Sequence, residues 1–148
     1  MNKEFTRVRS IKDLTISSLL TIIGCALVAL PTSTSINLLG FFMIFAGIIL
    51  FMALRSAYKD IETGNIYKKT EYFFSQSMRQ EISNAIASKP EAIRITEEDK
   101  GNGVRLDIYH NQKTGKAFLQ LFEYVPYKYE PCSRVYEYKT AEINRLLK

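Results

Sequence analysis

The chain has 148 residues, with 20 Lys and Arg against 15 Asp and Glu, a formal net charge of +5, one His and two Cys. The single His and the two Cys exclude a zinc cluster, since neither Cys has ligand spacing to the other or to the His. The positive charge is mild, and there are no repeats or low-complexity stretches.

Residues 1–13 form a basic segment that also carries apolar residues at every third position. Its basic residues are Lys3, Arg7, Arg9 and Lys12, and its apolar residues are Phe5, Val8 and Ile11. This pattern predicts a short amphipathic turn in the interface of a membrane, where basic side chains reach anionic head groups. A plain charged flank of the next element is the alternative.

Two apolar runs follow, at residues 14–30 and 36–54, separated by the uncharged turn 31–35. No Asp, Glu, Lys, Arg or His occurs between Asp13 and Arg55. About 17 to 25 apolar residues in a helix cross the roughly 30 Å hydrocarbon core of a bilayer. We therefore predict a transmembrane helical hairpin over residues 14–54. For the first run, a cleaved signal peptide is the alternative, given its basic start and small residues near its end.

The distribution of Lys and Arg predicts the orientation of this hairpin. Basic residues flank both of its ends, whereas the turn 31–35 carries none. By the positive-inside rule, both termini lie in the cytoplasm and the protein is a multi-pass protein of the inner (cytoplasmic) membrane. Cys25 then lies within the membrane and Cys132 in the cytoplasm, so the two cannot form a disulfide.

Small residues predict how the two spans pack. Four lie at i, i+4 spacing in the first span and two glycines lie seven apart in the second: Ser17, Thr21, Cys25 and Ala29, then Gly40 and Gly47. Because small residues let helix backbones approach closely in lipid, we expect these two faces to meet. Alternatively, such residues are simply tolerated in membrane helices, or the ridge packs on a different membrane subunit.

After the second span we expect the helix to continue to Gly64 and Asn65, with residues 55–71 forming a basic juxtamembrane linker. A second helix then opens at Thr70 or Ser77, and Ser77 with Gln80 matches a capping box. Its apolar residues recur at helical spacing and Lys89-Pro90 ends it. The apolar residues are Phe74, Met78, Ile82, Ala85 and Ile86.

Alternating apolar residues predict three strands, at residues 93–96, 104–109 and 117–125. The third is apolar on both faces, so we expect it to be the central or best-covered strand. Turns at 100–103 and 112–116 make an antiparallel meander the economical arrangement. Residues 126–131 form a loop or edge segment between two prolines, residues 134–138 add a possible fourth strand at an edge, and Thr140 caps a last short helix.

The predicted fold is therefore a membrane protein in which the transmembrane hairpin precedes a small α+β cytoplasmic domain over residues 72–148. That domain comprises a helix, a three- to four-stranded antiparallel meander and a short C-terminal helix. Its element order resembles that of double-stranded-RNA-binding domains, which implies RNA binding. The family's lysine-rich start to the final helix is absent at residues 139–142, and the acidic run 97–99 is unsuited to phosphate. We expect no nucleic-acid partner.

No signature of catalysis, cofactor binding or metal binding emerges. A Cys132–His110 pair would need Glu123 or Asp107 to orient the His, and a His at the end of a hairpin strand is the simpler interpretation. Residues 97–99 lack the alternating ligands of a calcium loop. Gly101 and Gly103 read as turn glycines, because no helix start follows them. We expect a protein that is not an enzyme and that holds no cofactor or metal.

Tyrosines late in the chain are the most distinctive feature, since Tyr is enriched at protein interfaces. The predicted partner surface comprises Tyr124, Tyr127, Tyr129, Arg134, Tyr136 and Tyr138. Alternatively, these rings cover a thin sheet or lie at the level of the lipid head groups.

The function that we expect is a two-pass, membrane-anchored protein-binding module, an accessory or assembly subunit of a membrane complex. Its partners would be membrane lipids and either another protein or a second copy of the chain. An immunity or exclusion protein that acts at the membrane is one alternative. A membrane-bound enzyme that uses Cys132 or His110 is the other.

Overall fold

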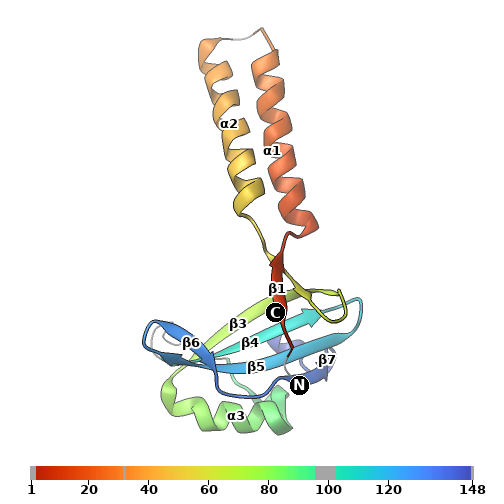
Figure 1. Cartoon of the computed structure of the whole chain (residues 1–148), viewed down its shortest axis with the longest axis vertical. Helices are drawn as coiled ribbons and strands as arrows, with labels where there is room; N and C mark the ends of the chain where they lie inside the picture. The colour runs from red at the N-terminus through yellow and green to blue at the C-terminus, as the bar shows by residue number, and fades with distance from the viewer. Residues whose placement is uncertain (1–2, 32, 96–102, 148) are drawn as a thin grey trace. The chain divides into compact units, whose positions relative to one another are not determined.

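A computed structural model describes residues 3–31, 33–95 and 103–147 of the chain. The chain folds as two units: a helical unit, Arg7–Ala57, and a sheet unit composed of Met1–Thr6 and Tyr58–Lys148. The two long apolar helices lie in the first unit (Figure 1). The acidic run 97–99 and the turn residues 100–102 lie outside the described residues.

The helical unit is a hairpin of α1 (Ile11–Ala29) and α2 (Thr34–Ala53). A capping box begins α1: the Ser10 hydroxyl accepts from the Asp13 N–H at 3.1 Å, and the Asp13 carboxylate accepts from the Ser10 N–H at 2.9 Å. The expected continuation of the second helix to Gly64 is wrong, because α2 ends at Ala53 and strand β2 (Ala57–Asp60) follows. The Asp13 carboxylate binds the N–H of Ser56 at 2.8 Å, which holds the backbone outside the helix.

Glycines line the contact between α1 and α2. A Cβ added to Gly40 would lie 2.8 Å from the carbonyl oxygen of Gly24, and one added to Gly47 would lie 3.0 Å from that of Ser17 and would also meet the Thr21 hydroxyl. Cys25 and Ala29, two members of the predicted ridge, are exposed. Gly24 takes the place in the contact that the prediction gave to its neighbour Cys25. The backbones therefore approach closely through Gly24, Gly40 and Gly47.

The sheet unit contains an antiparallel sheet with the strand order β1-β2-β3-β4-β5-β6, and β7 pairs with β5 beside β6. Its strands are β1 (Phe5–Val8), β2, β3 (Ile66–Phe74), β4 (Val104–Asn111), β5 (Lys116–Val125), β6 (Lys128–Pro131) and β7 (Tyr136–Lys139). The predicted β4–β5 hairpin is confirmed. Within the predicted loop or edge segment 126–131, Lys128–Pro131 form strand β6, and the fourth strand predicted over residues 134–138 forms as β7. The meander of three to four strands is too small, because the described residues alone form a seven-stranded sheet.

One surface of the sheet packs on α3 (Arg79–Ser88), which follows the short 3₁₀ turn η1 (Gln76–Met78) (Figure 1). Ile82 and Ile86 of α3 enter a core that includes the alternating β4 residues Val104, Leu106 and Ile108. The predicted capping box at Ser77 does not form, since Met78 is the N-cap and no side chain caps the helix. The expected burial of β5 on both faces is confirmed by Phe118, Leu119 and Leu121.

Two further expectations are wrong, and the element order differs from that of the family that the predicted order resembles. Residues 93–95 form no strand: the 3₁₀ turn η2 (Pro90–Ala92) precedes them and delivers Ile93 into the core. The final helix is only the 3₁₀ turn η3 (Asn144–Leu146), which buries Leu146. Because strands precede α3, the sheet unit does not have the helix-first order of double-stranded-RNA-binding domains.

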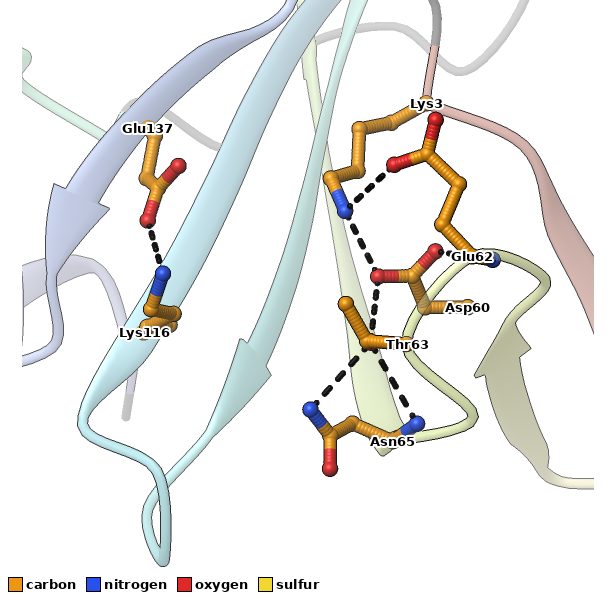
Figure 2. Close-up of polar contacts among 7 residues, drawn as sticks. All are labelled: Lys3, Asp60, Glu62, Thr63, Asn65, Lys116 and Glu137. Carbon is orange, nitrogen blue, oxygen red and sulfur yellow. Dashed lines mark hydrogen bonds and ion pairs between the residues drawn. The ribbon is translucent and has the colours of Figure 1, made fainter.

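Within the N-terminal segment, Phe5–Val8 form strand β1 of the sheet and not an amphipathic turn. The ring of Phe5 stacks on that of Tyr109, with centroids 4.0 Å apart and an interplanar angle of 7°. Nearby, the ammonium of Lys3 lies 2.7 Å from the fully buried carboxylate of Asp60, which also accepts from the Thr63 hydroxyl at 2.7 Å (Figure 2). Residues far apart in the sequence therefore hold the start of the chain in the sheet unit.

Candidate functional site

The second surface of the sheet carries charged and aromatic side chains. In β4, Arg105, Asp107 and Tyr109 alternate with the core residues, so they point away from α3. Their neighbours across β3 and β5 share this surface, which we call the polar–aromatic face. These neighbours are Lys69, Glu71 and Phe73 on β3, and Phe118, Gln120 and Phe122 on β5.

An ion cluster occupies the middle of the polar–aromatic face. The fully buried carboxylate of Asp107 accepts two hydrogen bonds from Arg105, at 2.7 Å from Nε and 3.0 Å from Nη2, and pairs with Lys69 Nζ at 2.7 Å. Burial lowers the pKa of Lys69, but its bonds to Asp107 and Glu71 raise it further, so the net shift is upward. The pKa of Asp107 is raised by burial, against the lowering effect of its two cations. Since these cations contact both carboxylate oxygens, the cluster links Lys69 of β3 to Asp107 and Arg105 of β4.

From this cluster, aromatic rings lead outward to the end of the sheet. The guanidinium carbon of Arg105 lies 4.6 Å from the centroid of the Tyr129 ring and 5.0 Å from that of Phe122. Tyr129 in turn contacts Tyr124 edge to face, with centroids 5.4 Å apart. Arg105 therefore supports the rings at the start of β6, where β5 turns back.

The turn between β5 and β6 presents one tyrosine fully to solvent. Because Val125 pairs with Lys128, only Pro126 and Tyr127 form the turn. Tyr127 has φ +74° and its residue is 98% exposed. This second turn position normally takes Gly, and a left-handed conformation costs an ordinary L-residue about 1–2 kcal/mol. The N–H of Tyr127 donates to the Tyr124 hydroxyl at 3.4 Å. We call residues 124–129 the tyrosine hairpin.

The predicted partner surface thus divides between the two faces of the sheet. Tyr124, Tyr127 and Tyr129 gather in the tyrosine hairpin. Tyr138 instead donates its hydroxyl to the carbonyl oxygen of Ile86 in α3 at 2.5 Å, and Tyr136 packs against the core with its ring 4.7 Å from the Arg134 guanidinium carbon. Tyr138, Tyr136 and Arg134 therefore lie on the side of the sheet that packs on α3, and not in the tyrosine hairpin. Arg105 was not among the predicted site residues, although its alternation with apolar residues indicates a polar second face.

Cys132 and His110 lie beside different residues of β5, far from each other. His110 pairs with Ala117, whereas the Cys132 N–H donates to the carbonyl oxygen of Leu121. Four residues of a strand span about 13 Å, which is too far for a nucleophile and its base. Burial raises the pKa of the Cys132 thiol, and burial together with Lys68 lowers that of His110. The pair therefore has neither the spacing nor the electrostatics of an activated thiolate.

Within the described ranges 3–31, 33–95 and 103–147, no group of three or more His, Cys, Asp and Glu side chains is placed to hold a metal ion. No protein-family model, no curated protein and no solved structure matches the chain.

Proposed function

We propose that this chain is a two-pass membrane protein whose sheet unit binds another protein through the tyrosine hairpin, as an accessory or assembly subunit of a membrane complex. The observation that carries the proposal is Tyr127, an almost fully exposed aromatic residue held at positive φ on the tip of a supported hairpin.

The two helices supply the membrane anchor. They comprise 19 and 20 residues, long enough to cross a bilayer, and they pack through a narrow seam of small residues. Large apolar side chains remain exposed around the rest of the hairpin, including Leu19, Ile22, Phe42, Phe45 and Ile49. Helices that are apolar on every side are typical of a lipid environment, since a water-exposed patch of this extent is unfavourable.

The path of the chain indicates that the two ends of the helical anchor lie on the same side of the membrane. Met1–Thr6 and Tyr58–Lys148 belong to one sheet unit, so the segments before α1 and after α2 must lie on the same side of a membrane. The basic residues Arg9, Lys12 and Arg55 at these ends favour the cytoplasmic side of the inner membrane.

Protein binding follows from the properties of the hairpin tip. Tyr and Arg dominate the energetics of protein interfaces, because a large ring with a polar end gains contact area at a low cost in conformational entropy. Tyr124 and Tyr129 brace the tip, and Arg105 braces Tyr129. Local strain that persists at an exposed position favours a role in binding, since a stability-neutral turn would use Gly.

The experiment replaces Tyr127 with the photoreactive aromatic residue benzoylphenylalanine in the full-length protein, expressed in its native host. We expect irradiation to yield one dominant adduct with a defined protein. A matched control carries the same residue at Lys113, an exposed position in the β4–β5 turn. In parallel, Tyr127→Gly relieves the positive φ and removes the ring, so it should lose the partner in affinity capture while leaving the fold at least as stable.

Equal crosslinking from positions 127 and 113, or full retention of the partner by Tyr127→Gly, would refute the role of the tyrosine hairpin. Recovery of the protein in the soluble fraction after cell disruption would refute the membrane anchor.

A further inference from the structure

Three cations gather at one end of the helical hairpin. Arg9 and Lys12 lie at the start of α1, Arg55 follows α2, and all three are exposed. The other end of the hairpin, residues 30–35, contains no charged residue. The charge of the helical unit is therefore concentrated on one rim.

The only acidic residue between Arg7 and Ala57 is Asp13, and neutral donors occupy its carboxylate. Oδ2 accepts from the N–H groups of Ser10 and Ser56 at 2.9 and 2.8 Å, and Oδ1 accepts from the Ser56 hydroxyl at 2.8 Å. The Asp13 residue is only 6% exposed. Because Lys12 precedes Asp13 and Arg55 precedes Ser56, this contact places the backbones of Lys12 and Arg55 at the same end of the hairpin, while the Asp13 carboxylate bonds to neutral donors and not to either cation.

Arg9 joins them through an aromatic contact. Its guanidinium carbon lies 4.1 Å from the centroid of the Phe51 ring, in the last turn of α2. An apolar ring beneath a guanidinium is the arrangement expected where a hydrocarbon region meets head groups, because the stem and ring stay in the apolar layer while the charge faces outward.

We propose that Arg9, Lys12 and Arg55 form a binding site for the head group of an anionic phospholipid. This inference rests on the membrane insertion proposed above. Guanidinium groups bind phosphate oxygens through paired N–H donors, and Lys adds a point charge. A phospholipid with a net negative head group satisfies all three cations, whereas in a zwitterionic one the choline competes with them for the phosphate.

The test uses the full-length protein in mild detergent, equilibrated with equal amounts of phosphatidylglycerol and phosphatidylcholine, with bound lipid counted by native mass spectrometry. We expect the wild type to retain phosphatidylglycerol selectively. Each basic side chain near anionic lipid strengthens association about fivefold, so Arg9→Gln/Lys12→Gln/Arg55→Gln should weaken retention by up to about 100-fold. The control Lys89→Gln/Lys113→Gln/Lys139→Gln removes three exposed cations from the sheet unit and should retain the lipid.

Equal binding of the two lipids by the wild type would overturn the site, as would unchanged selectivity in the first triple variant. Equal losses in both variants would also overturn it, because the attraction would then be diffuse. A second measurement on the wild type alone raises the salt concentration, which should abolish the selectivity. Absence of the wild type from cell membranes would instead refute the anchor itself, so the two failures are distinguishable.

Discussion

Asp107→Asn tests whether the ion cluster holds the polar–aromatic face. The substitution keeps the shape of the side chain but leaves Lys69 and Arg105 beside a neutral amide, with side chains that are 10% and 19% exposed. Removing one partner of a buried pair costs about 3–5 kcal/mol. Lys69 keeps its pair with Glu71, and Arg105 keeps its contacts with Phe122 and Tyr129, so we expect a loss near the lower value, about 3 kcal/mol.

The assay is guanidinium unfolding of the full-length protein in mild detergent, followed by circular dichroism of the strands. Glu137→Gln is the matched control, because the Lys116–Glu137 pair has the same 2.7 Å separation but side chains that are 55% and 43% exposed (Figure 2). It should leave the unfolding midpoint unchanged. Adding Lys69→Met to Asp107→Asn should restore part of the lost stability, since the uncompensated ammonium is removed.

A midpoint for Asp107→Asn that matches that of Glu137→Gln would refute this reasoning. The reasoning would also fail if Lys69→Met lowered the stability of the Asp107→Asn variant by as much as it lowers that of the wild type. The two side chains would then contribute to stability independently.

Two other predictions concern the docking of residues 3–6 in the sheet unit and the glycine contact between α1 and α2. Burial raises the pKa of Asp60, but bonds from Lys3 and Thr63 lower it further, so the net shift is downward. The stability that Asp60 contributes is therefore present above the ordinary pKa of a carboxyl group and should be lost as the pH falls through the lowered pKa. Asp60→Asn should remove this pH step and speed hydrogen exchange at residues 3–6, and unchanged exchange there would contradict the anchoring. Gly40→Val places a Cβ 2.8 Å from the carbonyl oxygen of Gly24 and should cost about 1–3 kcal/mol in thermal unfolding in detergent, whereas Ile49→Val on the exposed face should have little effect.

Local patterns account for the parts of the fold that could be predicted. The β4–β5 hairpin follows from alternation in residues 104–109 and an apolar run over residues 117–125 on either side of a Gly-containing turn, and Gly115 adopts φ +67°. The long helices follow from two runs without charge. In each case the information lies within about twenty neighbouring residues.

Pairing between distant segments explains what could not be predicted. β1 and β2 are short, and their contacts, such as Lys3 with Asp60 and Phe5 with Tyr109, join residues that no local period relates. Phe74, the last residue of β3, lies four residues before Met78 and so fits the helical spacing of the apolar residues that follow, which placed it in the wrong element.

The candidate site shows the same division. Composition singles out the late tyrosines, but the register on β5 decides which face each one joins. Tyr138 pairs with Ala117, a core position, whereas Tyr129 pairs with Tyr124 on the opposite face. The exposure of Tyr127 depends on a two-residue turn that Pro126 permits but does not specify.

The position of the first residues within the sheet bears on proteolytic processing. Cleavage after the first apolar run would remove Lys3 and Phe5 together with α1. The fully buried Asp60 would then lose its cation, and Tyr109 would lose the ring stacked on it. An uncompensated buried carboxylate is costly, so a processed chain would fold less stably than the intact one. The architecture thus favours retention of the first helix as a permanent part of the protein, and an N-terminal fusion partner would need a linker that leaves Lys3 and Phe5 free to dock.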